Sequence, residues 1–407
     1  MKKQFIKIAI IVGIVMFTSS AFACTTVILS GKVTKDGRPL MWKNTDTENL
    51  NHSLIYSDSK GYPLIGIARS SAKDADKAAI WTGTNSKGFS IMNTMSYNLT
   101  EANVASRNGA LMRQALEVCS NVPDFKKFLD TLKRPMNVEA NFGVIDAEGN
   151  AAYFETYTNG YHMVDVNDPA VAPEGYLVYT NFSYTGFYEK GAGYVRYYSA
   201  QRQVAKGLPS KAFTPQWIYT NLVRCYYNSL MDVDFTSAKA LDLFNSYIPD
   251  RDFIPRRSTA NSIVVHGVKK GENPELTTMW CALGFPPCTV ALPSWVKLGK
   301  ENSSLLVRTD TTGTSKICNM ALALKATVFN VQRGNGQEYL DFSKLYNKQN
   351  TGYIQQLRPI EDHVFTDVNV VLKKWREKGS LDVMEAKALN KSVATYVENA
   401  WTGLIVK

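Results

Sequence analysis

The chain has 407 residues, of which 45% are apolar and 20% are charged, with a formal net charge of +10. This composition excludes a disordered chain, a collagen-like fibre and a small disulfide-stapled domain. The lysines and arginines form no long run, so the charge does not indicate nucleic-acid binding. The length allows one large domain or two of ordinary size.

The first 23 residues predict a secretory signal peptide. Lys2 and Lys3 precede an apolar run over residues 8–17, and Ala21-Phe22-Ala23 has the small-x-small pattern of a cleavage site. The apolar run is about half the roughly 20 residues that a membrane-spanning helix needs, so no stable span is expected. Removing 23 residues with three lysines from 407 residues of charge +10 leaves 384 residues of charge +7. We therefore expect an exported protein, periplasmic or secreted, whose first residue is Cys24.

A cysteine directly after a signal peptide has three interpretations. Its thiol is lipidated as a membrane anchor, or it acts with its α-amine as a nucleophile, or it is an ordinary cysteine. Lipidation and catalysis exclude each other, because lipidation blocks the sulfur and normally the amine as well. Lipoprotein sites usually have leucine three positions before the cysteine, where this chain has Ala21, and a small residue where it has Phe22. The motif therefore favours the nucleophile over the lipoprotein.

The chemistry of an N-terminal cysteine suits amide cleavage. A free α-amine has a pKa of about 7.7–8.0 and a thiol about 8.5, so the neutral amine is well populated near neutral pH. The amine takes the thiol proton and later returns it to the leaving amine, and no histidine is required. The four histidines, at positions 52, 162, 266 and 363, form no recognisable cysteine–histidine or metal spacing.

Strands and helices are predicted along the chain. β-Branched residues, alternation and turn residues predict three strand pairs, over 24–30 with 39–46, 81–85 with 88–94, and 140–145 with 151–155. Two further strands are predicted over 177–181 and 262–265. The first hairpin would bring Asp46 beside Cys24. Helices are predicted from 108 and from 121 onward, and over 194–206, 214–231 and 381–401. No linker rich in glycine, proline or serine interrupts residues 24–407, so a single domain is preferred.

Several short motifs occur in a characteristic order. They are Cys24-Thr25-Thr26, the Lys-Asn-x-Asp segment 43–46, the Asn-x-x-Gly-Phe turn that leads to Asn93, the Asp-x-x-Gly hairpin at 146–149 and Thr180-Asn181. Together they resemble the N-terminal-nucleophile linear amide hydrolases: choloylglycine (bile-salt) hydrolases, penicillin V acylases, acyl-CoA:6-aminopenicillanate acyltransferase-like proteins and a related dipeptidase family. The resemblance covers residues 24–200 clearly. It implies an α+β fold, a four-layer αββα sandwich, with which the predicted order of elements agrees.

The resemblance also implies roles for individual residues. Cys24 matches the nucleophile, and Asp46 matches the aspartate that holds the α-amine in place. Asn93 matches a position that binds the developing oxyanion, where one such donor contributes roughly 3 kcal/mol. Asn181 matches the second asparagine of these sites. The alternative is that Asp46 is an ordinary turn aspartate and that Asn93 and Asn181 are buried turn asparagines without a catalytic role.

Two further positions are basic. Lys43 stands where many relatives carry arginine, so it keeps the charge but loses the bidentate fork. Bile-salt-type relatives also use a later arginine, and the candidates are Arg256 and Arg257, of which Arg257 is our choice. An exposed basic pair is the alternative. Tyr184, Phe187 and Tyr188 are candidates for an acyl pocket, or they pack at its rim.

The other five cysteines cannot all pair within one chain. Cys281 and Cys288 are the nearest candidates for a disulfide, zinc spacing is lacking, and buried free thiols are the default.

The sequence thus predicts an exported enzyme that cleaves a linear amide of a small-molecule substrate through a Cys24 acyl-enzyme, without metal or organic cofactor. Conjugated bile salts, penicillin V and N-acyl amino acids are the favoured substrates. Dipeptide cleavage and acyl transfer remain alternatives, as does a non-catalytic lipoprotein lipidated at Cys24. The sequence leaves the oligomeric state open, a homo-oligomer included.

Overall fold

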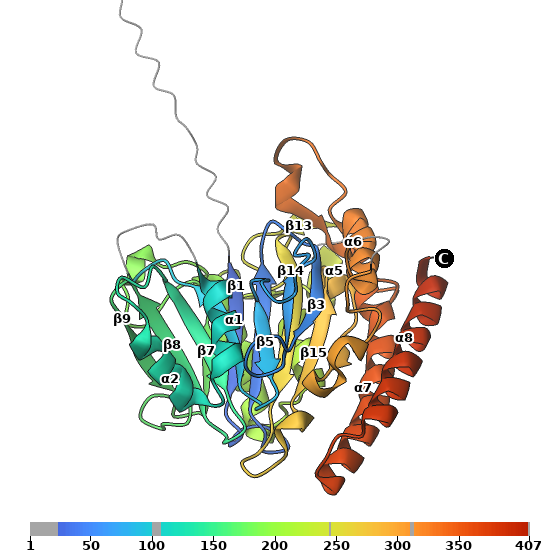
Figure 1. Ribbon diagram of the computed structural model, residues 1–407. Coiled ribbons are helices and arrows are strands. Elements are labelled where there is room, and N and C mark those ends of the chain that lie inside the picture. Colours follow the sequence, from blue (N-terminus) through green and yellow to red (C-terminus); the bar gives the residue numbers. More distant parts are fainter. Residues whose placement is uncertain (1–22, 100–106, 244–245, 310–312, 406–407) are drawn as a thin grey trace, which may run out of the picture.

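The computed structural model describes residues 23–99, 107–243, 246–309 and 313–405 (Figure 1). The predicted signal peptide lies outside the described residues except for Ala23. Within the described part of the chain, no helix combines the length and the apolar character needed to cross a membrane.

The first sheet has six antiparallel strands in the order β10-β1-β2-β14-β15-β16. Their bounds are β10 (Tyr176–Tyr179), β1 (Cys24–Leu29), β2 (Leu40–Asp46), β14 (Thr259–His266), β15 (Thr278–Leu283) and β16 (Leu292–Ser294). Every residue of β1, β2, β14 and β15 is buried. A sheet whose residues are buried on both faces needs a covering layer on each side.

The second sheet is a seven-stranded antiparallel meander in sequence order. Its strands are β3 (His52–Ser57), β4 (Leu64–Arg69), β5 (Thr82–Asn85), β6 (Ser90–Met95), β7 (Ala140–Ile145), β8 (Ala151–Tyr157) and β9 (Gly160–Asp165). The predicted Asp-x-x-Gly turn joins β7 to β8. Asp146 Oδ1 accepts the main-chain N–H groups of Glu148 and Asn150, and Gly149 has φ +84°. The left-handed conformation explains the glycine at this position.

The two sheets pack face to face, and helices cover their outer faces. Tyr153 on β8 donates its hydroxyl to Thr26 on β1 at 3.1 Å. On the outer face of the second sheet, α2 inserts Phe125 edge-on against Phe142 and Phe154. On the outer face of the first sheet, the ring of Phe365 on α7 packs against Trp280 on β15, with 4.2 Å between the ring centres. The helices are α1 (Asn108–Val118), α2 (Val122–Thr131), α3 (Tyr194–Gly207), α4 (Pro215–Ile218), α5 (Ala238–Leu243), α6 (Lys316–Val328), α7 (Tyr353–Lys378) and α8 (Val383–Ile405).

The predicted four-layer αββα sandwich is confirmed. Figure 1 shows α1 and α2 on one flank of the stacked sheets and the α7–α8 hairpin on the opposite flank. The predicted strands of both sheets lie within three residues of their observed bounds. The helix predicted from residue 121 is α2, and Asn121 caps it by accepting the Asp124 N–H at 2.8 Å.

The prediction of a helix over 214–231 is wrong beyond residue 223. Helix α4 continues as a short π-helical turn, Tyr219–Val223, and the chain then forms a hairpin from β11 (Tyr227–Asn228) and β12 (Val233–Asp234). Asn228 Oδ1 accepts the N–H groups of Leu230 and Met231, so its side chain makes the turn that replaces the helical hydrogen bonds.

The 281/288 disulfide is also not formed, because all six cysteines are free thiols. A further two-stranded pair joins β13 (Tyr247–Pro249) to β17 (Tyr339–Asp341).

Candidate active site

Cys24 is the first residue of β1 and lies between the two sheets. Directly paired residues of antiparallel strands share one face, and Cys24 pairs with Thr45 while Thr26 pairs with Lys43. Cys24 and Lys43 therefore point to the same side, toward the second sheet. There Lys43 Nζ donates to Asn93 Oδ1 on β6 at 2.8 Å and to the Trp81 carbonyl at 2.9 Å. The structure thus brings together three of the predicted site residues: Cys24, Lys43 and Asn93.

Asn181 holds the main-chain nitrogen of Cys24. Its Oδ1 accepts the Cys24 N–H at 3.1 Å, and its Nδ2 donates to the Met95 carbonyl at 3.0 Å. The residue follows β10, the strand beside β1, so sheet pairing places it next to Cys24. Because both ends of the amide are engaged, the orientation of Asn181 is fixed.

Arg196 is a site residue that the sequence motifs did not predict. In the first turn of α3, its guanidinium donates to the Cys24 carbonyl at 2.6 Å, to Thr25 Oγ1 at 2.8 Å and to Asn181 Oδ1 at 2.8 Å. The side chain is fully buried, and burial, followed by the charge of Arg256, lowers its pKa to about 10. A signal existed: Arg196 is spaced four and eight residues before the buried Ala200 and Val204, so it lies on the core-facing stripe of the helix.

Asp46 is placed differently from its predicted role. Its carboxylate accepts Thr259 Oγ1 at 2.6 Å and Arg256 Nε at 2.8 Å, and it is almost completely buried. The Cys24 nitrogen is held by Asn181 instead. The main-chain N–H of Asp46 lies near the Cys24 thiol and lowers the pKa of that thiol. Asp46 therefore supports the site from the end of β2 and anchors Arg256 beside it.

Arg256, rather than Arg257, lies at this site. The main-chain N–H of Arg257 donates to the Asp250 carboxylate at 2.8 Å, and its guanidinium lies 5.3 Å from the centre of the Phe329 ring. Both arginines line a different cavity, of about 590 Å³. The reason is local geometry: residues 256–259 form a turn in which the Thr259 N–H donates to the Arg256 carbonyl at 2.8 Å, and the two neighbouring side chains leave it in different directions.

A cavity of about 540 Å³ opens onto Cys24 and Asn93. Its size is that of a small-molecule pocket. Its other lining residues, mostly apolar, are Arg69, Ser71, Ala72, Ala79, Ile80, Trp81, Met95, Asn108, Gly109 and Met112. The Arg69 guanidinium and Lys43 Nζ lie 5.8 and 5.6 Å from the centre of the Trp81 ring. Tyr184, Phe187 and Tyr188, the candidates for an acyl pocket, are not among the lining residues.

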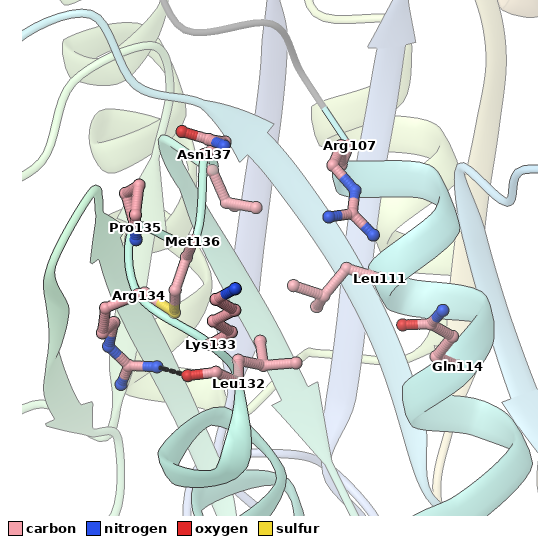
Figure 2. Close-up of a pocket in the computed structure, with 10 residues that line it drawn as sticks. Arg107, Leu111, Gln114, Leu132, Lys133, Arg134, Pro135, Met136 and Asn137 are labelled. Carbon is pink, nitrogen blue, oxygen red and sulfur yellow. Dashed lines mark hydrogen bonds between the residues drawn. The ribbon is translucent and has the colours of Figure 1, made fainter.

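A separate cavity of about 480 Å³ lies on another face of α1. Figure 2 shows Arg107, Leu111 and Gln114 of this region facing the segment 132–138 across it. Arg134 donates there to the Leu132 carbonyl. No predicted site residue lines this cavity, so the cavity at Cys24 is the candidate active site.

The electrostatics of the site favour a protonated thiol in the resting state. Burial raises the pKa of Cys24, and the charges of Lys43 and Arg196 offset this increase only in part. Burial likewise lowers the pKa of Lys43 from its usual value. The thiol therefore needs a base to become a nucleophile. Among the described residues, no group of three or more histidine, cysteine, aspartate or glutamate side chains is placed to hold a metal ion.

His52 lies behind the cavity wall as a buried neutral group. Its ring is 5.5 Å from that of Trp81, and its Nδ1 lies 2.7 Å from Asn261 Nδ2. Burial, followed by the charges of Arg69 and Lys43, lowers its pKa to about 3. In the unfolded chain the pKa is about 6.5.

This difference predicts an acid-sensitive core. Between pH 6.5 and 3 the unfolded chain binds a proton at His52 that the folded chain does not, so the free energy of unfolding falls as the pH falls. The slope for this group approaches about 1.4 kcal/mol per pH unit. In urea unfolding over this range, the stability difference between wild type and His52→Gln should shift in favour of the variant as the pH falls. His162→Gln, at an exposed position on β9, is the control. A wild-type-to-His52→Gln difference that is independent of pH would contradict the prediction.

Comparison with known proteins finds a family model that matches part of the chain. Residues 33–202 match the family model for acyl-coenzyme A:6-aminopenicillanic acid acyl-transferase. The match confirms the predicted resemblance over this segment. It includes Lys43, Asp46, Asn93, Asn181 and Arg196, whereas Cys24 precedes it. No curated protein matches the chain.

Three solved structures are similar at low sequence identity. A Caenorhabditis elegans N-acylethanolamine-hydrolyzing acid amidase orthologue has TM-score 0.38 and 13% identity, and the alignment covers 60% of this chain and 92% of the other. A mutant conjugated bile acid hydrolase from Clostridium perfringens has TM-score 0.39 and 14% identity, and the alignment covers 67% of this chain and 92% of the other. Penicillin V acylase from Agrobacterium tumefaciens has TM-score 0.37 and 11% identity, and the alignment covers 67% of this chain and 85% of the other.

Proposed function

We propose that the chain is exported, is cleaved between Ala23 and Cys24, and then hydrolyses a linear amide through an acyl-enzyme on Cys24. The observation that carries this proposal is that the main-chain N–H and the carbonyl of Cys24 each have a buried side-chain partner beside a cavity. Asn181 accepts a hydrogen bond from its nitrogen, and Arg196 donates one to its carbonyl. A structural cysteine requires no such arrangement, whereas a nucleophile whose own amine is the base does.

The chemistry follows from these positions. Cleavage turns the Cys24 nitrogen into an α-amine, which takes the proton of the thiol. The thiolate attacks the amide carbonyl, and the oxygen of the tetrahedral intermediate becomes negative. Lys43 holds Asn93 by its carbonyl oxygen, so the opposite end of the amide, Nδ2, donates to this oxyanion. Collapse expels the amine, which receives the proton from the α-ammonium group, and water then hydrolyses the thioester.

The burial of Cys24 supports the nucleophile over the lipoprotein. Its side chain is only 4% exposed, at the start of a central strand and between two sheets. A lipid on this sulfur would have to pass through the packed site to reach a bilayer. The same burial suits an acyl-enzyme, because a site closed to bulk water strengthens the hydrogen bonds to the oxyanion.

The cavity favours an N-acyl amide over a dipeptide. Its walls are mostly apolar, with Ile80, Trp81 and Met112 among them, and such walls suit an acyl group such as that of a bile salt, penicillin V or an N-acyl amino acid. Dipeptide cleavage and acyl transfer use the same Cys24 chemistry and differ in the group that leaves or in the acceptor that takes the acyl group.

A substrate panel with the purified exported protein tests the function. Intact mass should first give a chain that begins at a free Cys24. Conjugated bile salts, penicillin V, N-acyl amino acids and dipeptides are then incubated with it, with and without an acceptor amine, and the products are read by mass spectrometry. Release of the free acid from an N-acyl amide is the expected result. A lipid mass on Cys24, or a free Cys24 with no turnover of any amide, would refute the proposal.

A further inference from the structure

The cavity at Cys24 has a single cation in its wall. Among the described residues that line it, Arg69 alone is charged at neutral pH, and no aspartate or glutamate is present. Arg69 is the last residue of β4, at an exposed position, and its guanidinium lies 5.8 Å from the centre of the Trp81 ring. A few placed polar or charged groups in a mostly apolar cavity select the ligand, and a cation selects a negative charge.

This arginine forms no ion pair with a carboxylate of the described residues. The nearest acids along the chain are engaged elsewhere, since Asp74 pairs with Lys77 at 3.1 Å and Asp76 accepts the Ser57 hydroxyl at 2.6 Å. The segment 69–77 as a whole carries three basic and two acidic residues. The positive charge at the cavity is therefore not balanced by this segment.

The other cation near this wall is already engaged. Lys43 Nζ donates to Asn93 Oδ1 at 2.8 Å and to the Trp81 carbonyl at 2.9 Å. The donors left for an anion on a ligand therefore belong to Arg69. One guanidinium presents two parallel N–H groups to a carboxylate and balances one negative charge, whereas a phosphate dianion would keep a charge without a partner. The cavity thus matches a carboxylate better than a phosphate.

The position of Arg69 indicates where the carboxylate lies on the ligand. Arg69 is on β4 and Asn93 is on β6, with β5 between these strands in the sheet. Neighbouring strands are about 4.8 Å apart, so the two residues are separated by roughly 10 Å across the sheet. An extended chain advances about 3.5 Å for every three bonds, so an acyl chain of about eight carbons spans this distance.

We propose that the substrate is a linear amide whose acyl chain ends in a carboxylate, and that Arg69 binds this carboxylate. The inference rests on the proposed amide hydrolysis at Cys24 and names the substrate class of that site. The amide carbonyl lies between Cys24 and Asn93, and the methylene groups lie along apolar walls that include Ile80 and Met112. The carboxylate then reaches the exposed end of β4. A substrate of this kind is a monoamide of a dicarboxylic acid.

Binding to the exported Cys24→Ala protein tests the assignment without any turnover. The two probes are the N-methyl monoamide of octanedioic acid and N-methyl octanamide, which differ only in a terminal carboxylate or methyl group. Titration calorimetry gives the Kd of each probe. Arg69→Gln removes the charge from this protein and Arg69→Lys keeps it. Lys73→Gln is the matched control, because it removes an exposed positive charge four residues along the chain that does not line the cavity.

We expect the carboxylate probe to bind roughly fivefold or more tightly than the neutral probe. Arg69→Gln should abolish this preference and leave the Kd of the neutral probe within about twofold. Arg69→Lys should keep part of the preference, because the charge remains without the planar fork, and Lys73→Gln should keep all of it.

Three results would overturn the assignment: equal affinity for the two probes, no binding of either probe, or an equal loss of affinity for both probes in Arg69→Gln. The last result would show that Arg69 supports the cavity wall and does not read the ligand. Failure of amide hydrolysis is a separate result, because it is seen in the substrate panel with a free Cys24 thiol and does not enter these Kd values.

Discussion

Cys24→Ala is expected to abolish acyl-enzyme formation and to lower amide turnover by roughly 10⁴-fold or more, while the fold remains intact. Among the described residues that line the cavity, the Cys24 thiol alone combines nucleophilicity with a neighbouring base after cleavage. Removing one buried sulfur leaves a small void and costs about 1–2 kcal/mol, which a stable domain tolerates. The measurement is intact mass after a rapid acid quench, together with steady-state turnover and a thermal melt.

The matched control for this experiment is Cys119→Ala. Cys119 is a buried free thiol next to the C-terminus of α1, outside the cavity lining. Its loss should have a comparable effect on the melt and none on the acyl-enzyme. Cys24→Ala with unchanged turnover would refute the mechanism, and an equal loss of activity in both variants would show that stability, and not the nucleophile, had been measured.

The local part of the site could be predicted from the sequence. Alternation and turn residues over 24–46 specify a hairpin, and a hairpin places the end of one strand beside the start of the other. The observed register pairs Cys24 with Thr45, so Asp46 and Lys43 lie where this reasoning expects them. The turn before Asn93 is specified in the same way, because Gly88 supplies the left-handed residue at φ +75°.

The long-range part could not be predicted in this way. Arg256 and Arg257 lie in the turn that precedes β14, and a register shift between Thr259 and Asn261 separates them from the regular pairing of that strand. Such an irregularity reverses which residues face the site, and neither hydrophobic alternation nor turn chemistry locates it here. The contact of Arg196 with Cys24 spans 172 positions of sequence and depends on how α3 lies on the sheet.

Arg196→Gln is expected to lower kcat/KM by roughly 10²-fold or more and to shift the acidic limb of its pH profile to higher pH. The guanidinium makes three charge-assisted hydrogen bonds, each worth about 1.5–3 kcal/mol, and two of them fix Cys24 and Asn181. Its positive charge also disfavours the protonated form of a neighbouring α-amine. Without that charge the amine pKa rises, so the amine stays protonated, and inactive as a base, up to a higher pH.

Two variants separate this positioning role from a purely structural one. Arg196→Lys keeps the positive charge but loses the several N–H donors of the guanidinium group. The acidic limb should therefore return toward that of wild type, while kcat/KM stays low. Arg224→Gln breaks another buried arginine pair, with Glu361 at 2.7 Å, and leaves the contacts of Cys24 untouched. It should destabilise the protein by about 3–5 kcal/mol without moving the limb. If the acidic limb of the pH profile does not move in Arg196→Gln, or moves equally in Arg224→Gln, then Arg196 stabilises the fold and does not set the pKa of the α-amine.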